Sequence, residues 1–160
     1  MIRLLALAVL AQVAGCSAPE PADPPPTVMP EYPGGTPAVR DGDLDAARAR
    51  WEAAGWADYR FTLRRSCFCP SPDFTGPFEV TVRDGALASV TLDGAAVDDA
   101  RGLTVDELFA LIEEAYERDA ETVRLAFDEA TGAPTELYID YSTQMADEEI
   151  GYTVSDLEAL

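Results

Sequence analysis

Prolines are concentrated in one stretch of this chain and limit what that stretch can fold into. Eight of the chain's 12 prolines lie between residues 19 and 37. Proline fixes φ and lacks a backbone N–H, so such a stretch forms neither helix nor sheet and favours extended polyproline geometry. The sequence therefore predicts a proline-rich tether within residues 16–40, followed by a single domain over residues 41–160.

The residues before the tether have the three parts of a secretory signal. Met1-Ile2-Arg3 is a positive start, Leu4–Ala11 is an apolar run, and Val13-Ala14-Gly15-Cys16 is a small-residue exit. The apolar run is too short to cross a bilayer, which takes about 20 helical residues. The last four residues resemble a bacterial lipobox, where lipoproteins are cleaved and acylated. We therefore expect residues 1–15 to be a lipoprotein signal peptide; the alternative is an ordinary secreted protein with a chance cysteine.

A lipobox implies a location for the chain. By resemblance to lipoproteins, Cys16 carries a diacylglyceryl thioether and an acylated amine, with palmitate among the acyl chains. Two or more chains anchor a protein stably in a bilayer. Ser17 follows the cysteine, and in Gram-negative lipoproteins such a residue favours the outer membrane. The expected location is the bacterial cell envelope, lipid-anchored, and the outer membrane if the source is Gram-negative.

Composition excludes several classes of function. The chain has 30 acidic and 11 basic residues, a formal charge of −19, and no histidine, lysine or asparagine. A chain this acidic repels phosphate backbones, so nucleic acid is not an expected partner. The missing residue types remove every His-based catalytic triad, every His metal ligand and every Schiff-base lysine. What remains favours a protein that binds over one that catalyses.

Alternation of apolar and polar residues divides the domain into two helices and six strands. Asp43 is placed to cap a first helix, and Thr104 and Glu107 have capping-box spacing before a second. Asp84-Gly85 is a strong hairpin signal. The expected strands cover residues 59–64, 78–82, 87–92, 123–127, 137–141 and 150–154.

The order of these elements predicts the fold class. Helix, three strands, helix and three strands indicate an α+β fold with two helices packed on one face of a mostly antiparallel sheet. The same order also fits two helix-plus-three-strand halves.

Three strings of residues in the domain are distinctive. Ser66-Cys67-Phe68-Cys69-Pro70 follows an aromatic strand, Gly132-Ala133-Pro134-Thr135 precedes Ile139-Asp140-Tyr141, and Asp147-Glu148-Glu149-Ile150-Gly151-Tyr152-Thr153-Val154 lies near the C-terminus. Together they resemble a bacterial family known only as domain of unknown function 6174, often found on lipoproteins. The resemblance runs from about Leu44 to the C-terminus. It implies a shared fold and supplies no reaction, substrate or catalytic residue.

Cys67 and Cys69 are the two thiols left once Cys16 is acylated. Residues i and i+2 of a strand face the same side, so the two sulfurs are expected to be neighbours, with Cα atoms about 6.5 Å apart in a regular strand. In an exported protein, the first interpretation is a short structural disulfide that shapes the 66–77 loop. Three others stay open: a redox-active pair near an arginine, a soft-metal site, and two free buried thiols.

Four carboxylates flank the loop before the last expected strand. Asp140 closes one strand, and Asp147, Glu148 and Glu149 precede the next, so the loop between them can gather all four. Such oxygen ligands suit Ca²⁺, although no fixed calcium-loop spacing is present. A solvated acidic turn is the plainer interpretation.

These features together predict a membrane-anchored envelope lipoprotein of unknown specific function, whose domain is a non-enzymatic binding or scaffolding module. Its expected partners are the bilayer, through acylated Cys16, and an envelope protein or small ligand. Two alternatives belong to other classes. One is a thiol–disulfide protein that acts through Cys67 and Cys69, and the other is a calcium-dependent module that uses Asp140 and residues 147–149.

Overall fold

The computed structural model describes residues 41–142, 144–145 and 147–160, so the expected signal peptide, Cys16 and the tether lie outside the described residues. No helix among the described residues is long and apolar enough to span a bilayer. The helices are α1 (Asp41–Ala54) and α2 (Val105–Glu117), with short 3₁₀ helices η1 (Pro72–Phe74) and η2 (Asp99–Arg101). The strands are β1 (Tyr59–Cys67), β2 (Phe78–Arg83), β3 (Ala86–Leu92), β4 (Ala95–Ala96), β5 (Thr122–Phe127), β6 (Pro134–Asp140) and β7 (Ile150–Ala159).

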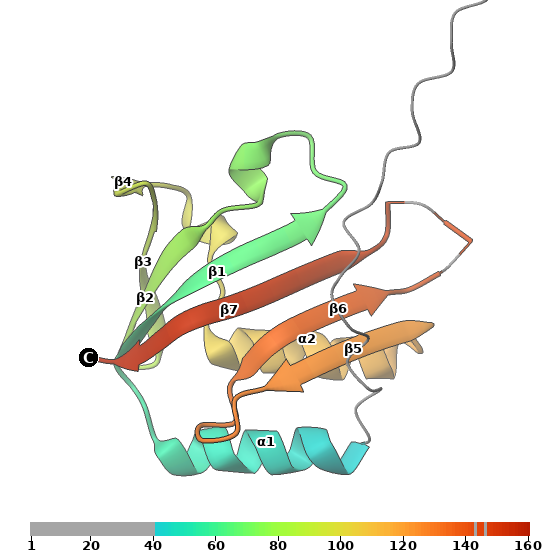
Figure 1. The fold of residues 1–160 in the computed structure, drawn as a ribbon, viewed down its shortest axis with the longest axis horizontal. Coiled ribbons are helices and arrows are strands. Elements are labelled where there is room, and N and C mark those ends of the chain that lie inside the picture. The colour runs from blue at the N-terminus through green and yellow to red at the C-terminus, as the bar shows by residue number, and fades with distance from the viewer. Residues whose placement is uncertain (1–40, 143, 146) are drawn as a thin grey trace, which may run out of the picture. The chain divides into compact units, whose positions relative to one another are not determined.

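The strands form one antiparallel sheet in the order β4-β3-β2-β1-β7-β6-β5 (Figure 1). The strand that begins the sheet along the chain, β1, therefore lies beside the strand that ends it, β7. Their pairing runs from Tyr59 opposite Ala159 to Cys67 opposite Ile150. The centre of the sheet is thus made from residues about 90 positions apart in sequence, which no local pattern can specify.

Both helices lie on the same face of the sheet. Tyr59 of β1 contacts both: its ring packs edge-on against Trp51 of α1, with centroids 5.2 Å apart, and its hydroxyl accepts a 3.1 Å hydrogen bond from the Val105 N–H of α2. Arg48 of α1 also lies over the Phe109 ring of α2, 5.0 Å from its centroid. The expected α+β fold, with two helices on one face of an antiparallel sheet, is confirmed.

The core lies between this face and the helices. Along β2, Phe78, Val80 and Val82 are completely buried, whereas the residues between them are at least partly exposed. Full burial of each large apolar side chain stabilises the fold by about 1.5–3 kcal/mol, so this face supplies most of the stability. The buried residues that α2 adds are Val105, Leu108, Phe109, Ile112 and Ala115.

The helix starts agree with the sequence at one helix and differ at the other. At α2, the Thr104 hydroxyl accepts from the Glu107 N–H at 3.2 Å, and the Glu107 carboxylate accepts from the Thr104 N–H at 2.6 Å. This is the predicted capping box. α1 begins at Asp41, so Asp43 lies in its first turn and does not cap it. The helix dipole favours acidic residues throughout the first turn, which makes the two placements look alike in sequence.

The two helix-plus-three-strand halves are both present but do not form a symmetric pair. Both halves order their strands third, second, first across the sheet, while β1 and β5 run in opposite directions. If a twofold rotation related the two halves, it would have to keep the strand order and reverse the strand direction. Such a rotation also exchanges the two faces of the sheet, so it would place α1 and α2 on opposite faces. Because both helices share one face, only the order of elements repeats.

Aspartate takes the backbone positions that asparagine often occupies elsewhere. The predicted hairpin at Asp84-Gly85 is present, and an unexpected second one at Asp93-Gly94 joins β3 to the short β4. Both have positive φ at both turn residues, as the type I′ turn of two-residue hairpins requires. The second hairpin therefore had the same signal as the first. The non-glycine residues with positive φ in the described part of the chain are Asp84, Asp93, Asp119, Asp147 and Asp156.

Candidate functional site

Polar side chains line the face of the sheet opposite the helices, which we call the open face. Its residues on β1 and β2 alternate with the buried ones. The register places Thr62 of β1 beside Glu79 of β2 and Glu79 beside Thr91 of β3, with Arg60 beside Thr81 in the next row. Among the described elements, Figure 1 shows no helix on this side of the sheet.

A bulge in β7 interrupts the open face next to these rows. Thr62 pairs with Ser155, but Arg60 pairs with Glu158, so the two strands slip in register between them. Asp156 lies in the slipped segment with φ at +55°, in the left-handed region. A bulge bends its strand and redirects the side chains around it, and it is often found beside functional sites.

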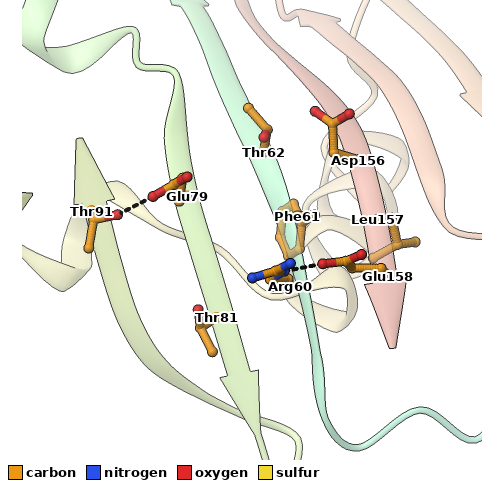
Figure 2. A pocket seen from close by; sticks show the side chains of 9 residues that line it. All are labelled: Arg60, Phe61, Thr62, Glu79, Thr81, Thr91, Asp156, Leu157 and Glu158. Atoms are coloured by element: carbon orange, nitrogen blue, oxygen red, sulfur yellow. Dashed lines mark hydrogen bonds and ion pairs between the residues drawn. The ribbon is translucent and has the colours of Figure 1, made fainter. Parts of the chain in front are cut away.

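The bulge borders a concavity of about 750 Å³ (Figure 2). Two contacts order its side chains. Thr91 Oγ1 donates a 2.9 Å hydrogen bond to Glu79 on one side, and Arg60 forms an ion pair with Glu158 on the other. The lining residues are Arg60, Phe61, Thr62, Glu79, Thr81, Thr91, Asp156, Leu157 and Glu158.

The chemistry of this lining suits reversible binding of a polar ligand. Its threonine hydroxyls can donate or accept hydrogen bonds, its carboxylates accept them, and the Arg60 guanidinium donates them. Phe61 adds almost no accessible apolar surface, because it is only 2% exposed. Three carboxylates against one guanidinium favour neutral or positively charged groups over anions.

Charge separates the sheet from the helices. The strands carry five arginines and five acidic residues, whereas α1 and α2 together carry nine acidic residues and two arginines. The strands are therefore neutral in sum and the helical layer is strongly acidic. A partner with any negative charge is repelled less by the open face than by the helical side.

Shifted pKa values mark structural contacts away from the concavity. Burial raises the pKa of Tyr59 to about 12. The Asp84 N–H, at 2.8 Å, holds the pKa of the Asp58 carboxyl below its ordinary value. The Thr131 hydroxyl, at 2.7 Å, lowers the pKa of Asp128. These groups stabilise the core and two turns, and none of the three lines the concavity.

Cys67 and Cys69 lie together, although not on a regular strand. β1 ends at Cys67, and the Cys69 N–H donates a 2.8 Å hydrogen bond back to the Cys67 carbonyl. This turn brings the two Cα atoms to 5.2 Å, and the sulfurs form a disulfide. The spacing of about 6.5 Å expected for a regular strand is wrong because the chain turns at Phe68. The structural-bridge and redox interpretations both require this pairing.

Two of the four carboxylates predicted to bind calcium accept hydrogen bonds from backbone groups of their own loop. Asp140, the last residue of β6, accepts a hydrogen bond from the Ser142 N–H at 3.0 Å, and Glu149 accepts one from the Asp147 N–H at 3.2 Å. Within the described part of the chain, no three cysteine, aspartate or glutamate side chains are grouped to hold a metal ion. The calcium site of Asp140, Asp147, Glu148 and Glu149 stays a prediction.

The concavity is the candidate site that sequence reasoning misses. Its residues read as ordinary outward positions of separate strands, and only the register brings Thr62, Glu79 and Thr91 into one row. The bulge also has no clear local signal. Its single hint is an aspartate in a chain without asparagine, which leaves aspartate and glycine for left-handed backbone positions.

Comparison with known proteins gives one match. A family model described as "Family of unknown function (DUF6174)" covers residues 43–159. Neither the curated proteins nor the solved structures contain a match.

Proposed function

The chain belongs to DUF6174, a family of unknown function, and from that premise we propose that it is a lipid-anchored lipoprotein of the bacterial envelope with a non-enzymatic binding domain. The open face is its binding surface. The concavity at the β7 bulge is the centre of that surface, and the ligand is a polar group or a partner protein in the envelope.

The anchoring half of the proposal is supported by the sequence before the domain. Val13-Ala14-Gly15-Cys16 resembles a lipobox at the end of a signal-like segment, and the proline-rich tether follows it. If residues 17–40 take the extended geometry that their prolines favour, at about 3.1 Å per residue, the tether would reach roughly 70 Å. Such a reach lets the domain contact molecules well beyond the bilayer surface.

The binding half is supported by one observation, the concavity on the open face. A solvated polar face is ordinary in an antiparallel sheet and by itself indicates no function. This sheet also has a strand bulge, a space of about 750 Å³, and donor and acceptor groups from four neighbouring strands converging on it. A β-bulge redirects the side chains around it, and bulges are frequent beside the functional sites of proteins.

Intact mass tests the anchor. We expect wild-type protein extracted from its native membranes to lack residues 1–15 and to carry acyl chains, and the Cys16→Ser chain to carry none. The Cys67→Ser/Cys69→Ser chain is the matched control, because it should remain acylated. An unacylated wild-type mass would contradict the anchor.

Photocrosslinking tests the binding surface. A photoreactive side chain at position 81, on the open face, should give a discrete adduct in the native envelope. The same group at position 52, on the exposed side of α1, should give none. Equal labelling at the two positions, or none at either, would contradict a binding role for the open face.

Thiol–disulfide exchange is a second candidate, favoured by the paired sulfurs of Cys67 and Cys69. A bond that closes a loop of one intervening residue removes little chain entropy, so it stabilises the fold only slightly. This candidate requires a reduction potential above the structural range. A measured potential below about −300 mV would exclude it.

A further inference from the structure

Phe68 is the most exposed large apolar side chain in the described part of the molecule. Its exposed fraction is 79%, against 54% for Met145 and 46% for the C-terminal Leu160. It lies at the turn that follows β1, between the two half-cystines. An isolated exposed apolar residue needs no explanation by itself, so the case depends on how its backbone is held.

The loop that carries Phe68 joins β1 to β2 and includes η1 (Figure 1). Its backbone is held at several points. The disulfide and the 2.8 Å bond from the Cys69 N–H to the Cys67 carbonyl close the turn on both sides of the phenylalanine. Further along, the Arg65 N–H donates to the Thr75 carbonyl at 2.9 Å.

η2 supports the same loop from outside it. The Arg101 guanidinium donates to the Asp73 carbonyl and lies over the Phe74 ring, 4.7 Å from its centroid. These contacts hold the backbone of the loop, and they would be the same with a polar residue at position 68.

A rigid turn that presents an aromatic ring to solvent is suited to docking. An aromatic side chain offers a large apolar area with only two torsions to fix, and a prefixed backbone removes the cost of ordering the loop on binding. Residues of this kind, seated in a pocket of the partner, dominate the binding energy of many interfaces.

Charge around the loop indicates what kind of partner fits. The register places Cys67 opposite Ile150, which directly follows Asp147, Glu148 and Glu149. The guanidinium of nearby Arg65 lies over the Tyr152 ring, 5.4 Å from its centroid. Phe68 is therefore presented beside a run of three carboxylates, which disfavours an anionic lipid surface and favours basic groups.

We propose that Phe68, held outward by the Cys67–Cys69 turn, is the residue through which the domain docks into an apolar pocket edged by lysines or arginines on an envelope protein. The inference goes beyond the proposed function and uses a different surface. It does not require the open face to bind anything.

The first test replaces Phe68 with a photoreactive phenylalanine in the full chain, in its native cells. We expect one discrete protein adduct that is weaker at 0.5 M than at 0.1 M salt, because exposed charges are screened. An adduct from position 81 without one from position 68 would retain the proposed function and overturn this inference. No adduct from either position would count against both.

The second test uses the protein recovered in that adduct as the probe and measures its affinity for the full chain. Phe68→Ala should weaken binding about tenfold or more, while Phe68→Trp retains it and the control Met145→Ala changes it little. Cys67→Ser/Cys69→Ser should also weaken binding, with the thermal midpoint nearly unchanged. Equal affinity of Phe68→Ala and wild type would overturn the inference.

A third measurement separates a protein partner from a membrane. The unacylated Cys16→Ser chain should not float with vesicles of phosphatidylglycerol and phosphatidylethanolamine. Flotation that Phe68→Ala abolishes would show that the ring inserts into lipid, and would overturn the protein-pocket proposal.

Discussion

The two faces of the sheet are built from alternate residues of the same strands and have opposite roles. The face that packs against the helices, which we call the closed face, includes Phe78 and Val80, and both are completely buried. Glu79 and Thr81 lie on the open face and contact solvent. Closed-face side chains contribute through burial, and open-face side chains make exposed contacts that each contribute little. One strand thus contributes to stability through one side and exposes its other side to solvent.

The largest expected effect comes from the closed face. Phe78→Ala removes a completely buried ring from β2 and should lower the free energy of unfolding by about 3–5 kcal/mol. Thr81→Ala, on the open face of the same strand, should change it by less than about 0.5 kcal/mol. Urea unfolding of both variants measures the contrast. Similar losses would mean that the open face is also structural.

The next effect tests how α1 is seated. A Cβ at Gly132, whose φ is +80°, would overlap the Ala47 carbonyl oxygen of α1 and lie 2.9 Å from the Arg50 Cβ. Gly132→Ala should therefore cost roughly 2–4 kcal/mol. Gly94→Ala is the matched control, because Gly94 has φ at +78° with no atom within 4 Å. It should cost only the backbone strain, about 1 kcal/mol. Equal losses of stability for Gly132→Ala and Gly94→Ala would show that α1 can move away from the added Cβ at little cost.

Tyr59→Phe should have a smaller effect that depends on pH. It removes the acceptor of the Val105 N–H and should cost about 1–2 kcal/mol near neutral pH. Burial raises the folded pKa of Tyr59 from 10.0 to about 12. The stability that the neutral phenol contributes is therefore complete below pH 10 and is lost as pH rises toward 12.

Urea midpoints measured between pH 8 and 12 check this sign. Wild type should lose stability across pH 10–12, and Tyr59→Phe should lose less. The variant keeps a residual slope, because burial also raises the pKa values of Tyr138 and Tyr152. Parallel curves for wild type and variant would contradict the assignment to Tyr59.

The smallest expected effect is on the open face. Arg60 and Glu158 form an ion pair whose side chains are both more than half exposed. Glu158→Gln should therefore change the free energy of unfolding by less than about 0.5 kcal/mol, and 0.5 M salt should remove the difference. A loss above 2 kcal/mol would mean that the β1–β7 pairing depends on this contact. The open face would then also contribute to stability, and the two faces would no longer differ in that respect.

Sequence reasoning predicts the fold further than it predicts the site. The capping box at Thr104 and Glu107, the Asp84-Gly85 hairpin and the buried alternation of β1 and β2 all agree with the structure. The start of α1, the short β4 and the spacing of Cys67 and Cys69 do not. In each of these, two local conformations suit the same residues, and contacts further along the chain choose between them.

The sequence by itself determined the main helices and strands, the apolar side of each and the closeness of Cys67 and Cys69, because those depend on residues that are near each other along the chain. Only the tertiary structure decided that β1 lies beside β7, where Arg60 meets Glu158 98 residues later. It also decided the bulge at Asp156 and the concavity beside it. Strand order and register are set by the packing of distant segments, and each strand's own pattern is compatible with many neighbours.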